Sequence, residues 1–157
     1  MLCAQHALNS LLQGHYFTAP DLSAIAHSLD ALEHTYDEDT RGGTSTNMDD
    51  TGFFSVQVLE NALQVWGLSL VRWRSEAMRP YQDHPHTQLA FILNQSQHWY
   101  TLRRFGRVSP NPSLDADPGD GHWFNLNSSL PAPERIGSYI WACSCTKPKP
   151  KGTPSLP

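Results

Sequence analysis

The sequence predicts an α+β fold in which N-terminal helices pack on an antiparallel sheet. Helical patterns fill the region up to residue 67, and runs rich in aromatic and branched residues, separated by turn signals, follow from residue 68. Helices first and strands afterwards are typical of α+β domains. A chain of 157 residues suits one core rather than two, so we expect a single domain.

The first helix is predicted from Cys3 to just before Gly14, which supplies a C-terminal stop. Its apolar residues have the spacing of one buried stripe: Ala4, Ala7, Leu8, Leu11 and Leu12. Cys3 therefore lies in the first turn, where unpaired N–H groups and the helix dipole favour an anion. The thiolate is the reactive form of cysteine, so this position suits a nucleophile, although a small cysteine packed in the core fits it equally.

Two further helices are predicted. Thr18 and Asp21 form a variant of the capping box, and the helix after them buries Leu22, Ile25, Ala26 and Leu29. The acidic connection over 33–50 is either a solvated loop or a mobile arm that admits a partner. Residues 49–51 are expected to cap a third helix that ends at Gly67 and carries Phe54, Val58, Ala62, Val65 and Trp66.

Four strands are predicted next, over residues 68–73, 89–93, 98–102 and 122–127. His98 begins the third of these strands and Asn127 ends the fourth. A register that sets His98 opposite Asn127 also sets Phe105 opposite Asp120, and the residues between them form a loop. The asparagine oxygen can then accept from the imidazole, although a strand-end histidine and a turn asparagine are also ordinary structural residues.

Cysteine at a helix N-terminus, followed by histidine and asparagine on adjacent strands, is the papain-type arrangement for nucleophilic acyl transfer. Six segments that occur in order closely resemble the Josephin-domain family of ubiquitin-specific cysteine proteases: residues 2–9 (LCAQHALN), 25–27 (IAH), 47–55 (NMDDTGFFS), 62–67 (ALQVWG), 98–99 (HW) and 123–128 (WFNLNS). The resemblance spans residues 2–107 and 122–140, and it implies a papain-like fold and cleavage after the C-terminal glycine of ubiquitin.

The resemblance implies a role for each matching residue. Cys3 would be the nucleophile, His98 the general base and then acid, and Asn127 the residue that orients the imidazole. It also implies two ubiquitin-contacting surfaces, one of Val56, Gln57 and Trp66 and one of Tyr16 and Phe17. The connection over 33–50 lies where the family carries a helical hairpin over the cleft, and it is shorter here.

The sequence departs from the family in three places. The family carries an oxyanion-donating glutamine upstream of its cysteine, whereas only Met1 and Leu2 precede Cys3 here. An insert occupies residues 108–121, and a Cys/Lys/Pro tail over 141–157 replaces the expected last helix and strand. We therefore expect a catalytic domain over 1–140 with an atypical loop, a disordered tail, and a product truncated at both ends. A ubiquitin-binding module with impaired catalysis is the alternative, because the upstream glutamine is missing.

Composition narrows the remaining classes of function. The net charge is −4, the basic residues are scattered, and no apolar run approaches a membrane span, so we expect neither nucleic acid nor membrane as a partner. Three cysteines fit a reducing compartment, and the resemblance implies nucleus and cytoplasm. We expect a monomer without a cofactor. A metal site of His84, His86, Cys143 and Cys145 lacks recognised ligand spacing.

Overall fold

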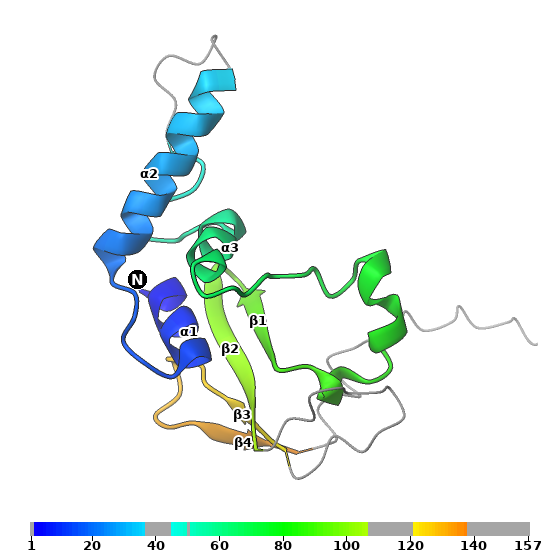
Figure 1. Ribbon diagram of the computed structural model, residues 1–157. Coiled ribbons are helices and arrows are strands. Elements are labelled where there is room, and N and C mark those ends of the chain that lie inside the picture. Colours follow the sequence, from blue (N-terminus) through cyan, green and yellow to red (C-terminus); the bar gives the residue numbers. More distant parts are fainter. Residues whose placement is uncertain (1, 37–44, 50, 107–120, 138–157) are drawn as a thin grey trace, which may run out of the picture.

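The computed structural model describes residues 2–36, 45–49, 51–106 and 121–137 (Figure 1). Its helical elements are α1 (Cys3–Leu12), α2 (Ala19–Tyr36), α3 (Val56–Gln64), and the short 3-10 helices η1 (Glu76–Tyr81) and η2 (Pro85–Thr87). Its strands are β1 (Ala90–Gln95), β2 (His98–Phe105), β3 (His122–Asn125) and β4 (Glu134–Ile136). The predicted α+β class is confirmed.

The four strands form one antiparallel sheet in the order β1-β2-β3-β4. In Figure 1, α1 lies against the strands and α2 projects away from the rest of the molecule. Among the described residues, no helix combines the length and the apolar character needed to cross a membrane. The sheet and α1 position the candidate site, because Cys3 begins α1 and His98 begins β2.

The strand expected over residues 68–73 is not formed, and β4 was not expected. Leu68 and Leu70 pack against the core while Val71 is exposed, so the alternation of apolar side chains is present. Within the described residues no strand pairs with this segment. A strand needs a hydrogen-bonded neighbour as well as an alternating pattern, and the alternation alone led to the wrong prediction.

The core lies where α1, α2 and α3 meet the sheet. Ala4, Leu8, Leu22, Val58 and Leu59 have no exposed surface. The predicted stripes of α1 and α2 are confirmed, since Leu12, Ile25 and Leu29 pack against the same cluster. Burial of these two stripes holds the helices on the sheet.

The helix ends agree only in part with the sequence. The predicted capping box is confirmed, because the backbone N–H and the hydroxyl of Thr18 donate to Asp21 Oδ2 at 2.8 and 2.6 Å. The stop of α1 is Gln13, which adopts the left-handed conformation with φ 58°, rather than Gly14. A Cβ atom at Gly14 would overlap the ring of Tyr16, so a larger residue there would displace that ring.

The predicted cap of α3 is wrong. Ser55, four residues beyond Thr51, accepts from the backbone N–H of Val58 at 3.4 Å and is the N-cap. Asp49 instead accepts from the backbone N–H groups of Thr51 and Phe53, which closes a turn before the helix, and Asp50 lies outside the described residues. Val65 was expected on the buried face, but it follows the end of α3 and is exposed.

One buried hydrogen bond ties α1 to β2. The hydroxyl of Thr101 donates to the carbonyl of Ala7 at 2.8 Å, and Thr101 has no exposed surface. We predict that Thr101→Val destabilises the protein by about 1 kcal/mol, because the buried bond from the hydroxyl to the helix is lost while the side-chain volume stays nearly the same. Urea unfolding of the two proteins measures the difference.

Thr35→Val is the matched control for this prediction. Thr35 donates to the carbonyl of Ala31 at the same 2.8 Å, but this bond is exposed, so water can replace the hydroxyl. We expect a change within about 0.5 kcal/mol for the control. Equal losses in the two variants would contradict the importance of burial at Thr101.

Asp30 ties α2 to the segment before α3. Burial acts to raise the pKa of its carboxyl, but hydrogen bonds from Ser45 and Asn47 outweigh burial and hold this pKa below its ordinary value of 3.8. Asp30 therefore contributes stability above that pH, and the contribution is lost as the pH falls through the lowered value.

We predict that Asp30→Asn lowers the melting temperature more at about pH 6 than at about pH 3, because the carboxylate contributes only in its charged form. Thermal unfolding of both proteins at the two pH values tests this. A difference in melting temperature that does not depend on pH would contradict it.

Candidate active site

Cys3 is the first residue of α1, and its side chain is only 2% exposed. Leu2 occupies the N-cap, and no side-chain hydrogen bond caps this helix. Serine, threonine or aspartate at the cap would compete for the N–H groups of the first turn, whereas leucine leaves them to other acceptors. The sulfur thus lies at a helix terminus whose donors are not taken by a cap.

A tight turn of the sheet covers the sulfur. Cys3 Sγ lies 3.9 Å from the carbonyl oxygen of Gln97, the residue immediately before His98. Ser96 and Gln97 connect β1 to β2, and both have positive φ, 52° and 61°. Two left-handed residues form the hairpin turn that matches the twist of the strands, and this turn places the start of β2 beside the thiol.

His98 and Asn127 are joined by a hydrogen bond of 2.7 Å between Nε2 and Oδ1. Asn127 Oδ1 also lies 2.9 Å from the backbone N–H of Ser129, which can only donate. This contact assigns the oxygen rather than the amide nitrogen to that position. Since the oxygen can only accept, Nε2 of His98 carries the hydrogen, and Nδ1 is left to accept a proton.

The irregular segment after β3 holds Asn127 by its own hydrogen bonds. Its backbone N–H donates to Asn125 Oδ1 at 3.1 Å, and its carbonyl accepts from Leu130 at 3.0 Å. On the other side, the ring of His98 stacks on that of Tyr100, with centroids 6.1 Å apart. Both partners are therefore restrained before any substrate binds.

The predicted register is wrong by two residues. Phe105 pairs with His122 and Leu102 with Asn125, and Asp120 lies outside the described residues. A shift of two residues leaves every side chain on its expected face, whereas a shift of one would have reversed them. Asn127 consequently reaches His98 as a diagonal neighbour rather than from directly across the ladder.

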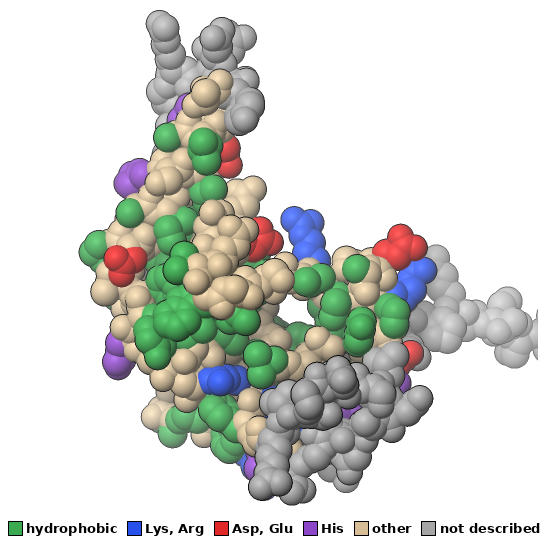
Figure 2. Space-filling model, in the orientation of Figure 1, with side chains coloured by type: hydrophobic (Ala, Val, Ile, Leu, Met, Phe, Trp, Pro, Cys, Tyr) green, Lys and Arg blue, Asp and Glu red, His purple; other side chains and the backbone are tan. Residues whose placement is uncertain are grey.

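The structure exposes four of the five residues of the two expected contact surfaces and buries the fifth. Val56 and Gln57 are exposed in the first turn of α3. Tyr16 is 51% exposed and Trp66 is 44% exposed, and the centroids of their rings lie 4.4 Å apart. Tyr16 and Trp66 therefore share one surface. Figure 2 shows hydrophobic side chains gathered in the region of α1 and α3. Phe17 is only 9% exposed and belongs to the core.

Sequence reasoning missed Asn9, which fixes the backbone of this surface. Asn9 is buried in α1, and its Oδ1 accepts from the backbone N–H groups of Tyr16 and Phe17 at 3.1 and 2.9 Å. Its Nδ2 donates to the carbonyl of Phe17 at 2.9 Å. A polar residue on the buried side of an amphipathic helix was the available signal, because such a residue needs partners.

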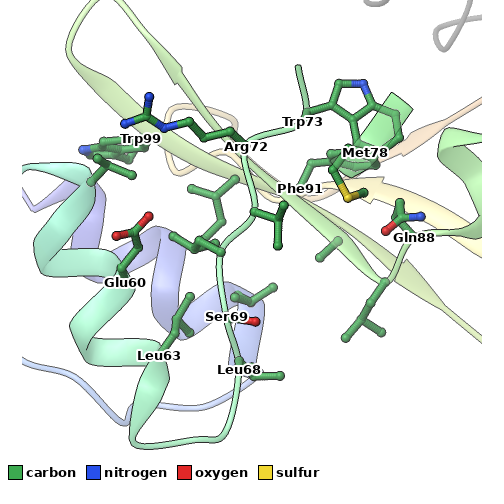
Figure 3. Close-up of a pocket in the computed structure, with 17 residues that line it drawn as sticks. Glu60, Leu63, Leu68, Ser69, Arg72, Trp73, Met78, Gln88, Phe91 and Trp99 are labelled. Carbon is green, nitrogen blue, oxygen red and sulfur yellow. The ribbon is translucent and has the colours of Figure 1, made fainter. Parts of the chain in front are cut away.

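Two cavities lie away from the thiol. The first, about 410 Å³, lies between α3, residues 68–73 and β1 (Figure 3), and its described lining includes neither Cys3 nor His98. The second, about 530 Å³, is lined by Phe105, Phe124 and Leu126 and reaches Asn127. The first cavity is thus separate from Cys3 and His98. The second cavity is a largely apolar space beside Asn127.

Among the described residues, no cluster of three or more histidine, cysteine or acidic side chains could hold a metal ion. His84 and His86 are neighbours, with ring centroids 5.8 Å apart. Cys143 and Cys145 lie outside the described residues.

Comparison with known proteins gives the family. The family model described as Josephin matches residues 1–141. Ataxin-3-like protein of Homo sapiens is 42% identical over 153 residues, covering 90% of this chain and 39% of the relative. Ataxin-3 of Mus musculus is 43% identical over 151 residues, covering 90% and 39%. The ataxin-3 homolog of Caenorhabditis elegans is 38% identical over 142 residues, covering 88% and 40%.

The chain spans about two fifths of the length of the curated relatives it matches, with 39% of the human relative covered. The family model, in contrast, matches most of the chain. The expected family is thereby confirmed: this chain belongs to the Josephin family.

Proposed function

We propose that this chain is a deubiquitinating cysteine protease that hydrolyses the peptide or isopeptide bond at the C-terminal glycine of ubiquitin. The observation that carries the proposal is the 2.7 Å hydrogen bond from His98 Nε2 to Asn127 Oδ1 in a Josephin chain. The thiol of Cys3, at the start of α1, contacts the carbonyl of Gln97, the residue before His98. The bond fixes the tautomer in which the other ring nitrogen can take the thiol proton.

The reaction proceeds in two halves. Cys3 loses its proton to His98, and the sulfur bonds to the carbonyl carbon of the glycine. The C–N bond breaks, His98 returns the proton to the leaving amine, and a thioester remains. His98 then takes a proton from water, whose oxygen bonds to the same carbon. The C–S bond breaks, His98 returns the proton to the sulfur, and the ubiquitin carboxylic acid releases its own proton to solvent to become the carboxylate.

Asn127 keeps the imidazole in place through both halves of the reaction. Its oxygen accepts from Nε2 whether the ring is neutral or charged, and the bond is stronger when the ring is charged. The tetrahedral intermediate carries negative charge on the former carbonyl oxygen. The backbone N–H of Cys3, at the uncapped start of α1, is our candidate donor to that oxygen.

The near-complete burial of Cys3 favours a substrate without side chains at the reacting end. Cys3 is 2% exposed and lies under the turn of Ser96 and Gln97. A glycine at the cleavage site requires the least space beneath this turn. The Tyr16–Trp66 pair and the exposed residues Val56 and Gln57 are our proposed contacts for the folded body of ubiquitin, because exposed aromatic residues are frequent anchors of binding.

A ubiquitin-binding module with impaired catalysis is the second candidate. The observation that favours it is the covered thiol, which contacts the carbonyl of Gln97 rather than solvent. Binding through α3 and Trp66 would not require the thiol at all. The two candidates therefore agree on the partner and differ in covalent chemistry. The nuclear and cytoplasmic location stays a prediction from the resemblance.

We predict that a ubiquitin derivative with a C-terminal electrophile forms a covalent adduct with the chain, and that Cys3→Ala abolishes it. Intact mass and peptide mapping identify the modified residue. His98→Ala should slow the reaction by about 10²–10⁴-fold, because it removes the general base. An adduct on another cysteine, or binding without any adduct, would refute the protease proposal, and binding alone would support the second candidate.

We predict that Trp66→Ala weakens ubiquitin binding to a Cys3→Ala chain by about tenfold or more, because an exposed aromatic anchor is lost. Isothermal titration calorimetry measures the dissociation constant. Tyr81→Ala is the matched control, since Tyr81 is also an exposed aromatic residue but lies in η1. Equal losses of ubiquitin affinity in the two variants would contradict the proposed contact at Trp66.

A further inference from the structure

Ser129 approaches the imidazole of His98 from the segment that follows β3. Its hydroxyl oxygen lies 3.3 Å from His98 Nε2. Its backbone N–H donates to Asn127 Oδ1 at 2.9 Å. The side chain is exposed, and no role was assigned to it from the sequence. Ser129 thus touches both members of the histidine–asparagine pair.

The end of the ladder between β2 and β3 explains this position. Leu102 pairs with Asn125, and the backbone N–H of Leu126 donates to the carbonyl of Thr101 at 2.9 Å. Beyond Leu126 the chain leaves the ladder, and a turn closed by the Leu130 N–H on the Asn127 carbonyl at 3.0 Å carries Ser129 to His98. Asn127 reaches the ring from a diagonal position. The expected register set Asn127 directly opposite His98 and gave Ser129 no contact with the ring.

Two acceptors consequently face one hydrogen. Nε2 carries the hydrogen, since Asn127 Oδ1 can only accept. The amide oxygen at 2.7 Å is the stronger partner, and the serine oxygen at 3.3 Å is the weaker one. A hydroxyl can rotate to present a lone pair, so it can take over when the amide is missing.

We propose that Ser129 is a positioning residue for His98. Its hydroxyl is the second acceptor for Nε2–H, and its backbone N–H holds the amide oxygen of Asn127 toward the ring. The proposal rests on the proposed function, in which His98 transfers protons through Nδ1. It predicts redundancy, because either acceptor alone keeps the hydrogen on Nε2 and the ring in place.

The test is a double-mutant cycle on the rate of reaction with the ubiquitin electrophile. Ser129→Ala should slow labelling by about threefold or less, because the stronger acceptor remains and the backbone N–H is unchanged. Asn127→Ala should cost at least about ten times more in the Ser129→Ala background than in the otherwise unaltered protein. Rates that simply multiply would overturn the proposal.

A spectroscopic readout separates positioning from general damage to the fold. Nitrogen-15 spectra of labelled histidine, assigned with a His98→Gln variant, report which ring nitrogen carries the hydrogen. The Nε2–H form should persist in each single variant and be lost in the double variant. In the Asn127→Ala background, threonine at position 129 in place of alanine should bring the Nε2–H form back, because threonine keeps the hydroxyl. Failure of this rescue would overturn the proposal.

Ser128→Ala is the matched control, as this exposed neighbouring serine should change neither the labelling rate nor the tautomer. The histidine spectra do not depend on turnover, so the two proposals fail separately. If the unaltered chain never labels, the protease proposal fails while the spectra still test Ser129. If the chain labels normally and the double variant keeps the Nε2–H form, the Ser129 proposal alone fails.

Discussion

The packing of α1 along β2 is the constraint on which the site depends. The two elements run in the same direction, since Cys3 contacts Gln97 and Ala7 contacts Thr101 further along. Small residues at Ala4 and Ala7 are fully or almost fully buried, which lets the helix backbone approach the sheet. The Thr101 hydroxyl then fixes the position of the helix along the strand, and the sulfur at its start meets the turn that precedes His98.

Most of the fold could be predicted because helical stripes and strand propensity are local signals. The stripes of α1 and α2 and the strands around His98 and Trp123 follow from neighbouring residues. The errors arose where the outcome depends on a distant partner. Residues 68–73 carry a strand pattern without a described neighbour, and Ser55 replaced residues 49–51 as the cap because Asp49 closes its own turn.

The candidate site could be predicted by residue type and chain order, but not by its contacts. The family strings pointed to Cys3, His98 and Asn127, and the predicted register was close enough to bring the last two together. No local pattern could show that Phe17 packs inward while Tyr16 meets Trp66, because adjacent residues point in different directions only once the backbone is fixed. Asn9 fixes that backbone from a helix eight residues earlier.

Asn127 lies beyond the end of β3, yet an irregular segment can hold it as firmly as a strand. Two bonds there are local: Asn125 Oδ1 accepts from the Asn127 N–H, and Asn127 Oδ1 accepts from the Ser129 N–H. Such local side-chain bonds favour turns over strands, which explains why the ladder stops at Asn125. Because Asn127 lies outside the ladder, strand pairing does not fix the direction of its side chain. Its amide can therefore face the imidazole of His98. The precision of the site thus comes from a short run of asparagine and serine residues that bond to their own backbone.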